Sequence, residues 1–259
     1  MPVRLPLAVT LLVTALLAVV GQTPAATADD AAGKKNPQAE RIQALKRLGA
    51  TVFEQGNRVV EVNANRTKIT DDDLRLVAGF PRITDLSLEE TKISDAGLAH
   101  LRRLRKLQWL NLYRCGIGDE GLKHLKAIES LQHLPLGETN VTDAGLAHLQ
   151  DMKLLVYLGL RGNDVGDEGL KHLSGLTKLA GLHLGETKVT DAGLKHLSSL
   201  RKLNKLWLNN TAVTDAAVEQ LAKLKALREL YVYESKMTTD GVKRLRIRLP
   251  RCRIVDRSE

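Results

Sequence analysis

Residues 179–202 read LAGLHLGETKVTDAGLKHLSSLRK, and this stretch recurs with variations through most of the chain. The apolar residues that open successive copies lie 24 positions apart, at Val59, Ile83, Leu107, Leu131, Leu155, Leu179, Leu203 and Leu227. A fixed period of this length is typical of stacked supersecondary units. The period therefore decides the fold class before any single residue does.

Each copy predicts one short strand followed by one short helix. The leucines at positions four and six of a copy point to the same side of an extended chain. Three more leucines, which are Leu194, Leu197 and Leu200 in the stretch quoted above, follow at helical spacing. Elements of this size have too little core to be stable alone, so the copies must stack. Stacking predicts parallel strands about 4.8 Å apart in one curved wall, with helices behind it.

The pattern LxxLxLxxT, followed by an apolar residue and then (T/S/G)DxGL, resembles the motif of leucine-rich repeat proteins. The form is closest to the ribonuclease-inhibitor-like and F-box-associated type of repeat. The resemblance covers residues 59–250 and implies an α/β solenoid, a horseshoe of about eight repeats with a parallel concave sheet and convex helices. The preceding residues contain no F-box, so the ubiquitin-ligase role of some relatives is not implied.

The residues before and after the repeats have distinct compositions. Residues 1–28 combine a lone Arg4, an apolar run and a small-x-small end, which predicts a signal peptide of an exported bacterial protein, periplasmic or extracellular after cleavage. An uncleaved membrane anchor is the alternative. Residues 29–36 are expected to be a linker, 37–58 an N-terminal cap of helix and hairpin strand, and 251–259 a closing half-repeat and tail.

The chain has 259 residues with a formal net charge of +9. This charge and the arginines near the C-terminus permit peripheral contact with an anionic envelope surface. Carboxylates occupy many concave positions, so we do not expect nucleic acid there. The two cysteines, Cys115 and Cys252, lie almost six repeats apart and are predicted to be free, buried thiols.

Three repeated polar columns have structural interpretations. The column that contains Thr187 and Cys115 predicts a ladder of hydrogen bonds to the backbone. The aspartate column, exemplified by Asp119, persists where the preceding threonine becomes glycine, so we expect each aspartate to cap its own helix. Calcium on the aspartates and zinc on the helix histidines, such as His124, are the metal-binding alternatives. Neither a metal nor a cofactor is predicted.

Positions three, five and seven of each copy should face the concave side, and they contain both tryptophans and all four tyrosines of the chain. Large rings on an open surface are typical of binding hot spots. We predict a shallow trough with aromatic walls and a low floor of glycine and proline. The alternative is that the rings only pack on each other. The candidate partner-binding residues are Trp109, Tyr113, His133, Tyr157, Arg161, His183, Trp207, Tyr231, Tyr233, Glu89 and Arg114.

These features favour an exported, non-enzymatic and monomeric scaffold that binds a protein or peptide. A glycan of the cell wall or a polysaccharide is the alternative ligand, because rings above a trough can stack on sugars. An enzyme, for instance a hydrolase with Glu89, Glu90 and Asp85, is disfavoured because an open surface offers no pocket for catalysis. No catalytic residue is predicted. A purely structural surface protein is the remaining class.

Overall fold

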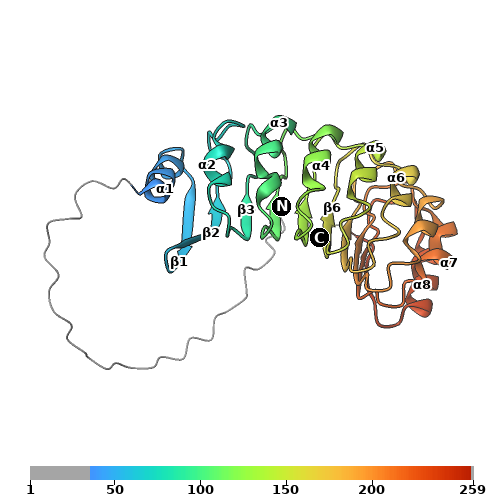
Figure 1. Ribbon diagram of the computed structural model, residues 1–259. Coiled ribbons are helices and arrows are strands. Elements are labelled where there is room, and N and C mark those ends of the chain that lie inside the picture. The colour runs from blue at the N-terminus through green and yellow to red at the C-terminus, as the bar shows by residue number, and fades with distance from the viewer. Residues whose placement is uncertain (1–35, 258–259) are drawn as a thin grey trace, which may run out of the picture. The chain divides into compact units, whose positions relative to one another are not determined.

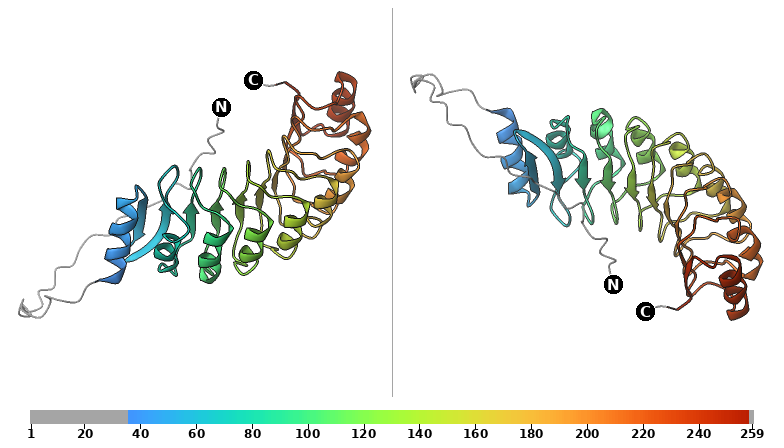
Figure 2. Two further views of the ribbon diagram at one scale, coloured as in Figure 1. Left: turned by 90° about the horizontal axis from the view of Figure 1, so that it is seen from above. Right: turned by 90° about the horizontal axis from the view of Figure 1, so that it is seen from below.

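The 24-residue repeats form a stack of coils. The structure is a computed structural model that describes residues 36–257. One ten-stranded sheet runs through this part, and its strands follow one another in sequence order (Figure 1). The strands line the inner side of a curve and the helices its outer side (Figure 2). The predicted signal peptide and all but the last residue of the predicted linker lie outside the described residues.

The strands of the repeats are short and parallel. They are β2 (Arg58–Asn63), β3 (Asp85–Ser87), β4 (Trp109–Asn111), β5 (His133–Pro135), β6 (Tyr157–Gly159), β7 (Gly181–His183), β8 (Lys205–Trp207), β9 (Glu229–Tyr231) and β10 (Arg253–Val255). Residues that pair between these parallel strands lie 24 positions apart, as Leu86 and Leu110 do. Backbone bonding continues beyond the strands, since the N–H of Leu88 donates to the carbonyl of Asn111 over 2.9 Å.

The outer side carries short helical segments, because each repeat must return to the sheet within its 24 residues. They are α2 (Leu74–Ala78), α3 (Asp95–Leu98), α4 (Asp119–Leu125), α5 (Asp143–Leu146), α6 (Asp167–Lys171), α7 (Val218–Leu221) and α8 (Thr239–Arg248), with 3-10 turns η1 (Ala99–Arg103), η2 (Ala147–Leu149), η3 (Gly193–Leu197) and η4 (Asp215–Ala217). Between helices and sheet, Leu182, Leu184 and Leu197 are fully buried. Burial of one such side chain stabilises the fold by about 1.5–3 kcal/mol.

Both ends of the leucine core are covered. At the N-terminal end, the Asn36 side chain accepts hydrogen bonds from the N–H groups of Gln38 and Ala39 and so caps α1 (Pro37–Arg47). The strand β1 (Thr51–Gln55) then pairs antiparallel with β2. At the other end, β10 pairs in parallel with β9. These elements protect the terminal repeats, whose apolar faces would otherwise be exposed.

The threonine column forms the predicted structural ladder. The hydroxyl of Thr187 donates to the carbonyl of Leu184 over 2.6 Å. In the same column, the Cys115 thiol donates to the carbonyl of Leu88 over 3.0 Å. Both cysteines are free, as predicted, but Cys252 is only partly buried. Cys115 therefore has a packing role in this ladder.

The expectation that each aspartate caps its own helix is wrong. Asp119 accepts hydrogen bonds from the next repeat, from the N–H of Thr142 over 2.8 Å and from its hydroxyl over 2.7 Å. The hydroxyl of Thr142 in turn accepts a bond from the N–H of Ala144 and caps α5. The aspartate therefore joins neighbouring repeats, because the unpaired N–H that it can reach precedes the following helix.

The glycine of the DxGL motif makes room for this carboxylate. A Cβ atom on Gly145 would lie 2.2 Å from Oδ1 of Asp119, closer than the two atoms can approach. One copy carries Ala217 at the equivalent place, and Asp191 still accepts both hydrogen bonds from Thr214 there. A single methyl group can thus be accommodated, although glycine leaves the carboxylate undisturbed.

We predict that Asp119→Ala lowers the free energy of unfolding by about 1–3 kcal/mol, because the N–H and the hydroxyl group of Thr142 both lose their acceptor. Asp151→Ala is the control, since Asp151 is 59% exposed and forms only a surface ion pair with Lys126. That change should cost less than about 1 kcal/mol. Urea unfolding measures both values, and equal losses would contradict the role given to Asp119.

Candidate ligand-binding face

The sheet register places the concave side chains in straight rows. Residues at position three pair strand by strand throughout, and those at position five do so except between β4 and β5, where only Trp109 and His133 pair. The first row is Glu61, Asp85, Trp109, His133, Tyr157, Gly181, Lys205 and Glu229. The second row is Asn63, Ser87, Asn111, Pro135, Gly159, His183, Trp207 and Tyr231. Side chains from different repeats therefore lie about 4.8 Å apart along each row.

Four of the predicted site residues form one aromatic cluster, the Trp207 stack. The Trp207 ring lies between His183, at a centroid distance of 4.9 Å, and Tyr231, at 5.4 Å. Tyr157 meets it edge-on at 6.3 Å. Trp207 is only 9% exposed. The expectation of an open hot spot at this ring is thus not met, because the neighbouring rings cover both of its faces.

Trp109 and His133 form a smaller stack, with centroids 5.7 Å apart and ring planes inclined by 26°. Both rings are partly exposed. The indole Nε1 of Trp109 is buried and has no hydrogen-bond partner within the described residues. A buried donor without a partner costs about 1–3 kcal/mol.

The predicted glycine floor is occupied by tyrosine rings. A Cβ atom on Gly181 would lie 2.8 Å from Cδ2 of Tyr157, and one on Gly137 would lie 3.0 Å from the ring of Tyr113. Glycine at these positions leaves room for the two rings to lie over the next strand. Burial raises the pKa of the Tyr157 hydroxyl to about 12, so it is neutral at pH 7.

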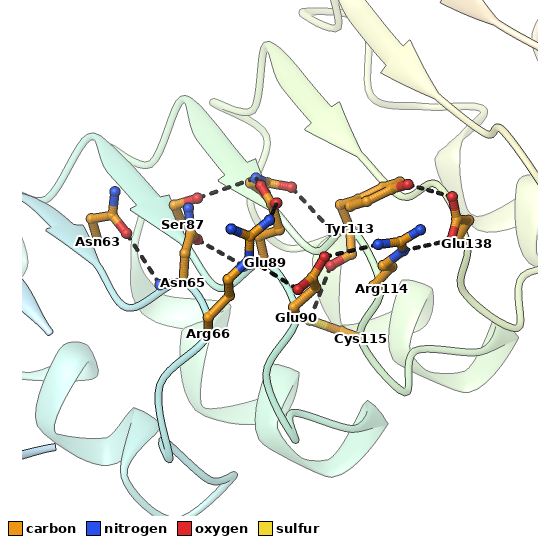
Figure 3. A network of polar contacts seen from close by, with 11 residues as sticks. Asn63, Asn65, Arg66, Ser87, Glu89, Glu90, Tyr113, Arg114, Cys115 and Glu138 are labelled. Atoms are coloured by element: carbon orange, nitrogen blue, oxygen red, sulfur yellow. Dashed lines mark hydrogen bonds and ion pairs between the residues drawn. The ribbon is translucent and has the colours of Figure 1, made fainter. Parts of the chain in front are cut away.

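An alternating row of charges, the rim ladder, runs along the ends of the strands (Figure 3). It comprises Arg66, Glu90, Arg114 and Glu138. Glu90 accepts hydrogen bonds from the Nε of Arg66 and the Nη1 of Arg114, each over 2.9 Å. Arg114 also donates to Glu138 over 2.5 Å. These four residues have φ values of 53–57°, whereas Gly162 takes the equivalent place in the following repeat and interrupts the ladder.

Several of the predicted contact residues belong to the rim ladder or bond to one of its members. Arg114 is part of the ladder, and the Tyr113 hydroxyl donates to Glu138. Burial, followed by this carboxylate, raises the pKa of Tyr113 to about 12. Glu89 pairs with Arg66 at 3.4 Å. Outside the ladder, the Nε of Arg161 donates to Glu186 over 2.9 Å.

Tyr233 is the remaining predicted residue, and His183 of the Trp207 stack makes one further contact. The Nδ1 of His183 accepts a hydrogen bond from the N–H of Gly185 over 3.2 Å. Burial, with a smaller effect of Arg161, lowers the pKa of His183 to about 3, so its ring is neutral at pH 7. Tyr233 follows β9 and is partly buried, and burial raises its pKa. Tyr233 follows Tyr231 by two residues, but it is not one of the four rings of the Trp207 stack.

Phe53, Glu61 and Asp85 are concave residues outside the predicted set that lie in one row. Phe53 in β1 pairs with Glu61 and is 47% exposed. Glu61 pairs in turn with Asp85, which precedes Trp109 in the same row. The 24-residue period could not identify Phe53, because β1 lies outside the repeats. Only the alternation of side chains along the hairpin strand β1 indicates that Phe53 lies on the same side of the sheet as Glu61.

Other surfaces offer less specific chemistry. The arginines of α8 are largely neutralised, since Arg244, Arg246 and Arg248 pair with Asp215, Asp256 and Glu219. A hollow of about 520 Å³ on the rim beside Gly162 is wide open. Within residues 36–257 no three side chains of His, Cys, Asp or Glu gather so that they could hold a metal ion. The concave rows therefore remain the candidate site.

Comparison with known proteins identifies the family. A family model described as leucine-rich repeat region matches residues 86–253. The chain belongs to the leucine-rich repeat family. The fold predicted from the motif is thereby confirmed. Among curated proteins, no sequence matches this leucine-rich repeat chain significantly.

Two solved structures share the leucine-rich repeat fold. Internalin C2 from Listeria monocytogenes str. 4b F2365 is 22% identical, with a TM-score of 0.59, over 80% of this chain and 88% of that one. The ectodomain of the Arabidopsis receptor kinase HAESA is 16% identical, with a TM-score of 0.62, over 85% of this chain and 40% of that one. At these identities the likeness concerns the fold alone.

Among residues 36–257 of this leucine-rich repeat chain, no helix is both long enough and apolar enough to cross a bilayer.

We predict that the two tryptophans contribute unequally to stability. Trp207→Ala should lower the free energy of unfolding by about 3–5 kcal/mol, because it empties the centre of a buried stack. Trp109→Ala should cost less, since that ring is partly exposed and stacks on His133 alone. Urea unfolding of both variants measures the difference. Losses of equal size would contradict the structural role assigned to Trp207.

Proposed function

We propose that this protein is an exported, monomeric and non-enzymatic scaffold that binds a protein or peptide on its concave face. The observation that carries the proposal is the Trp109–His133 stack, which is partly exposed in the middle of a sheet face and contains a buried indole N–H without a partner. Large aromatic rings that combine an apolar body with a polar atom are favoured at interfaces.

Two further points support binding rather than catalysis. The concave carboxylates at the rim are held by arginines, as Glu90 is by Arg66 and Arg114, and they do not face each other across a cleft. The HAESA ectodomain, which shares the fold, was crystallised with a peptide hormone ligand. The repeat motif, assigned to the ribonuclease-inhibitor-like type, leaves most residues with structural roles.

Export is the second part of the proposal. It rests on the composition of residues 1–28, where a basic start, an apolar run and small residues are arranged as in a signal peptide. A peptide ligand is favoured over a glycan by the Trp207 stack. Both faces of Trp207 are already covered by His183 and Tyr231, so this ring is not free to stack on a sugar.

The proposal predicts that peptides selected on the full chain from a random display library depend on the concave face. Affinities measured by fluorescence anisotropy should fall at least about tenfold in Trp109→Ala/His133→Ala, because such rings are the residues on which interfaces depend most. Lys123→Ala/Lys171→Ala on the convex helices should leave them unchanged. Circular dichroism checks that each variant is folded. Peptides that bind all three proteins equally would contradict the proposal.

A further inference from the structure

Four concave side chains from four neighbouring strands form one row at the N-terminal end of the sheet. Phe53 of β1 pairs with Glu61 of β2, Glu61 pairs with Asp85 of β3, and Asp85 pairs with Trp109 of β4. Three strand spacings make this row about 14 Å long. Two aromatic rings therefore flank two carboxylates on one open surface, which we name the acidic subsite.

The carboxylates of the acidic subsite differ from most other acids around the concave face. Five of those acids pair with arginine or lysine: Glu89, Glu90, Glu138, Glu186 and Glu229. Glu61 and Asp85 form no ion pair with any residue of the described chain. Asp85 accepts only the hydroxyl of Thr84, over 2.6 Å. Two negative charges thus lie side by side without a positive one.

Without a bound cation, the two neighbouring carboxylates destabilise the folded chain. Like charges opposite each other on adjacent strands repel. Burial, together with Asp85, raises the pKa of Glu61 above its ordinary value. The ionised Glu61 therefore lowers the free energy of unfolding at pH values above the pKa that this group has in the unfolded chain. The cost disappears as the pH falls and Glu61 is protonated. A cation bound above both carboxylates would remove this cost at neutral pH.

The rings of the acidic subsite suit an organic cation. Phe53 is 47% exposed, which is unusual for so large an apolar side chain. His133 stacks on Trp109 from the β5 side, so Asp85 is the neighbour of Trp109 on the β3 side. Indole is the best aromatic partner for a cation. A small inorganic cation would gain nothing from the exposed Phe53, whereas a side chain with an apolar stem would pack on it.

We propose that the acidic subsite holds a basic side chain of the peptide partner, arginine in preference to lysine. The inference rests on the proposed function and adds the charge of the ligand to it. A guanidinium group is planar and donates in two directions, so it can pair with Glu61 and Asp85 while it stacks against an aromatic ring. An ammonium group pairs with carboxylates but does not stack in this way.

The test uses the peptides selected on the full chain and replaces each basic residue in turn. Arginine is exchanged for citrulline, which keeps the shape and removes the charge. On the unmodified protein this exchange should weaken binding by about two- to fivefold, as expected for ion pairs at a partly exposed site. On Glu61→Gln/Asp85→Asn it should have no effect. Exchange of arginine for lysine should weaken binding by a smaller factor.

Two controls separate charge recognition from misfolding. Glu120→Gln/Asp151→Asn makes the same change of net charge at exposed positions outside the concave rows and should retain the citrulline effect. Glu61→Gln/Asp85→Asn should melt at a temperature no lower than that of the unmodified protein, because the substitutions remove a repulsion. If that melting temperature is measured, a loss of binding in this variant does not result from unfolding.

The outcomes distinguish this inference from the proposed function. A citrulline effect that persists in Glu61→Gln/Asp85→Asn, or selected peptides without basic residues, would overturn the acidic subsite. If those same peptides still require Trp109 and His133, the concave binding face stands. Peptides that are indifferent to both double variants would overturn the two proposals together.

Discussion

The structure depends on one constraint, the in-register pairing of each strand residue with the residue 24 positions further on. Behind the sheet this register aligns leucines such as Leu182 and Leu206 into a continuous core. At the helices it brings Asp119 within hydrogen-bonding distance of Thr142. On the open face the same rule arranges unrelated side chains in rows. Packing, repeat coupling and the binding surface thus follow from a single spacing.

The sequence period predicted the strands, the concave position of the rings and the threonine ladder, because these depend on spacing alone. It could not show the partner of Asp119, since a column of aspartates looks the same whether it bonds within a repeat or between repeats. The burial of Trp207 depends on the rings of His183 and Tyr231 on adjacent strands. Phe53 was not predicted as a concave residue, because its strand precedes the repeats.

The concave face is chemically uneven although the scaffold behind it is regular. Its C-terminal half is consolidated by the Trp207 stack, and its rim is neutralised by the ladder from Arg66 to Glu138. The N-terminal half retains the unpartnered indole N–H of Trp109 and the unpaired charges of Glu61 and Asp85. The exposed carboxylates that the fold leaves unpaired are groups that a ligand can satisfy, and we therefore propose that recognition takes place on β1–β5.

The most direct test of the register is excision of one whole repeat, residues 155–178, compared with the shorter deletion of residues 155–174. The first deletion keeps every later leucine and aspartate in step, and we predict a folded protein that unfolds cooperatively in urea. The second removes fewer residues but shifts them out of step, and we predict loss of cooperative unfolding. Equal behaviour of the two proteins would contradict the account.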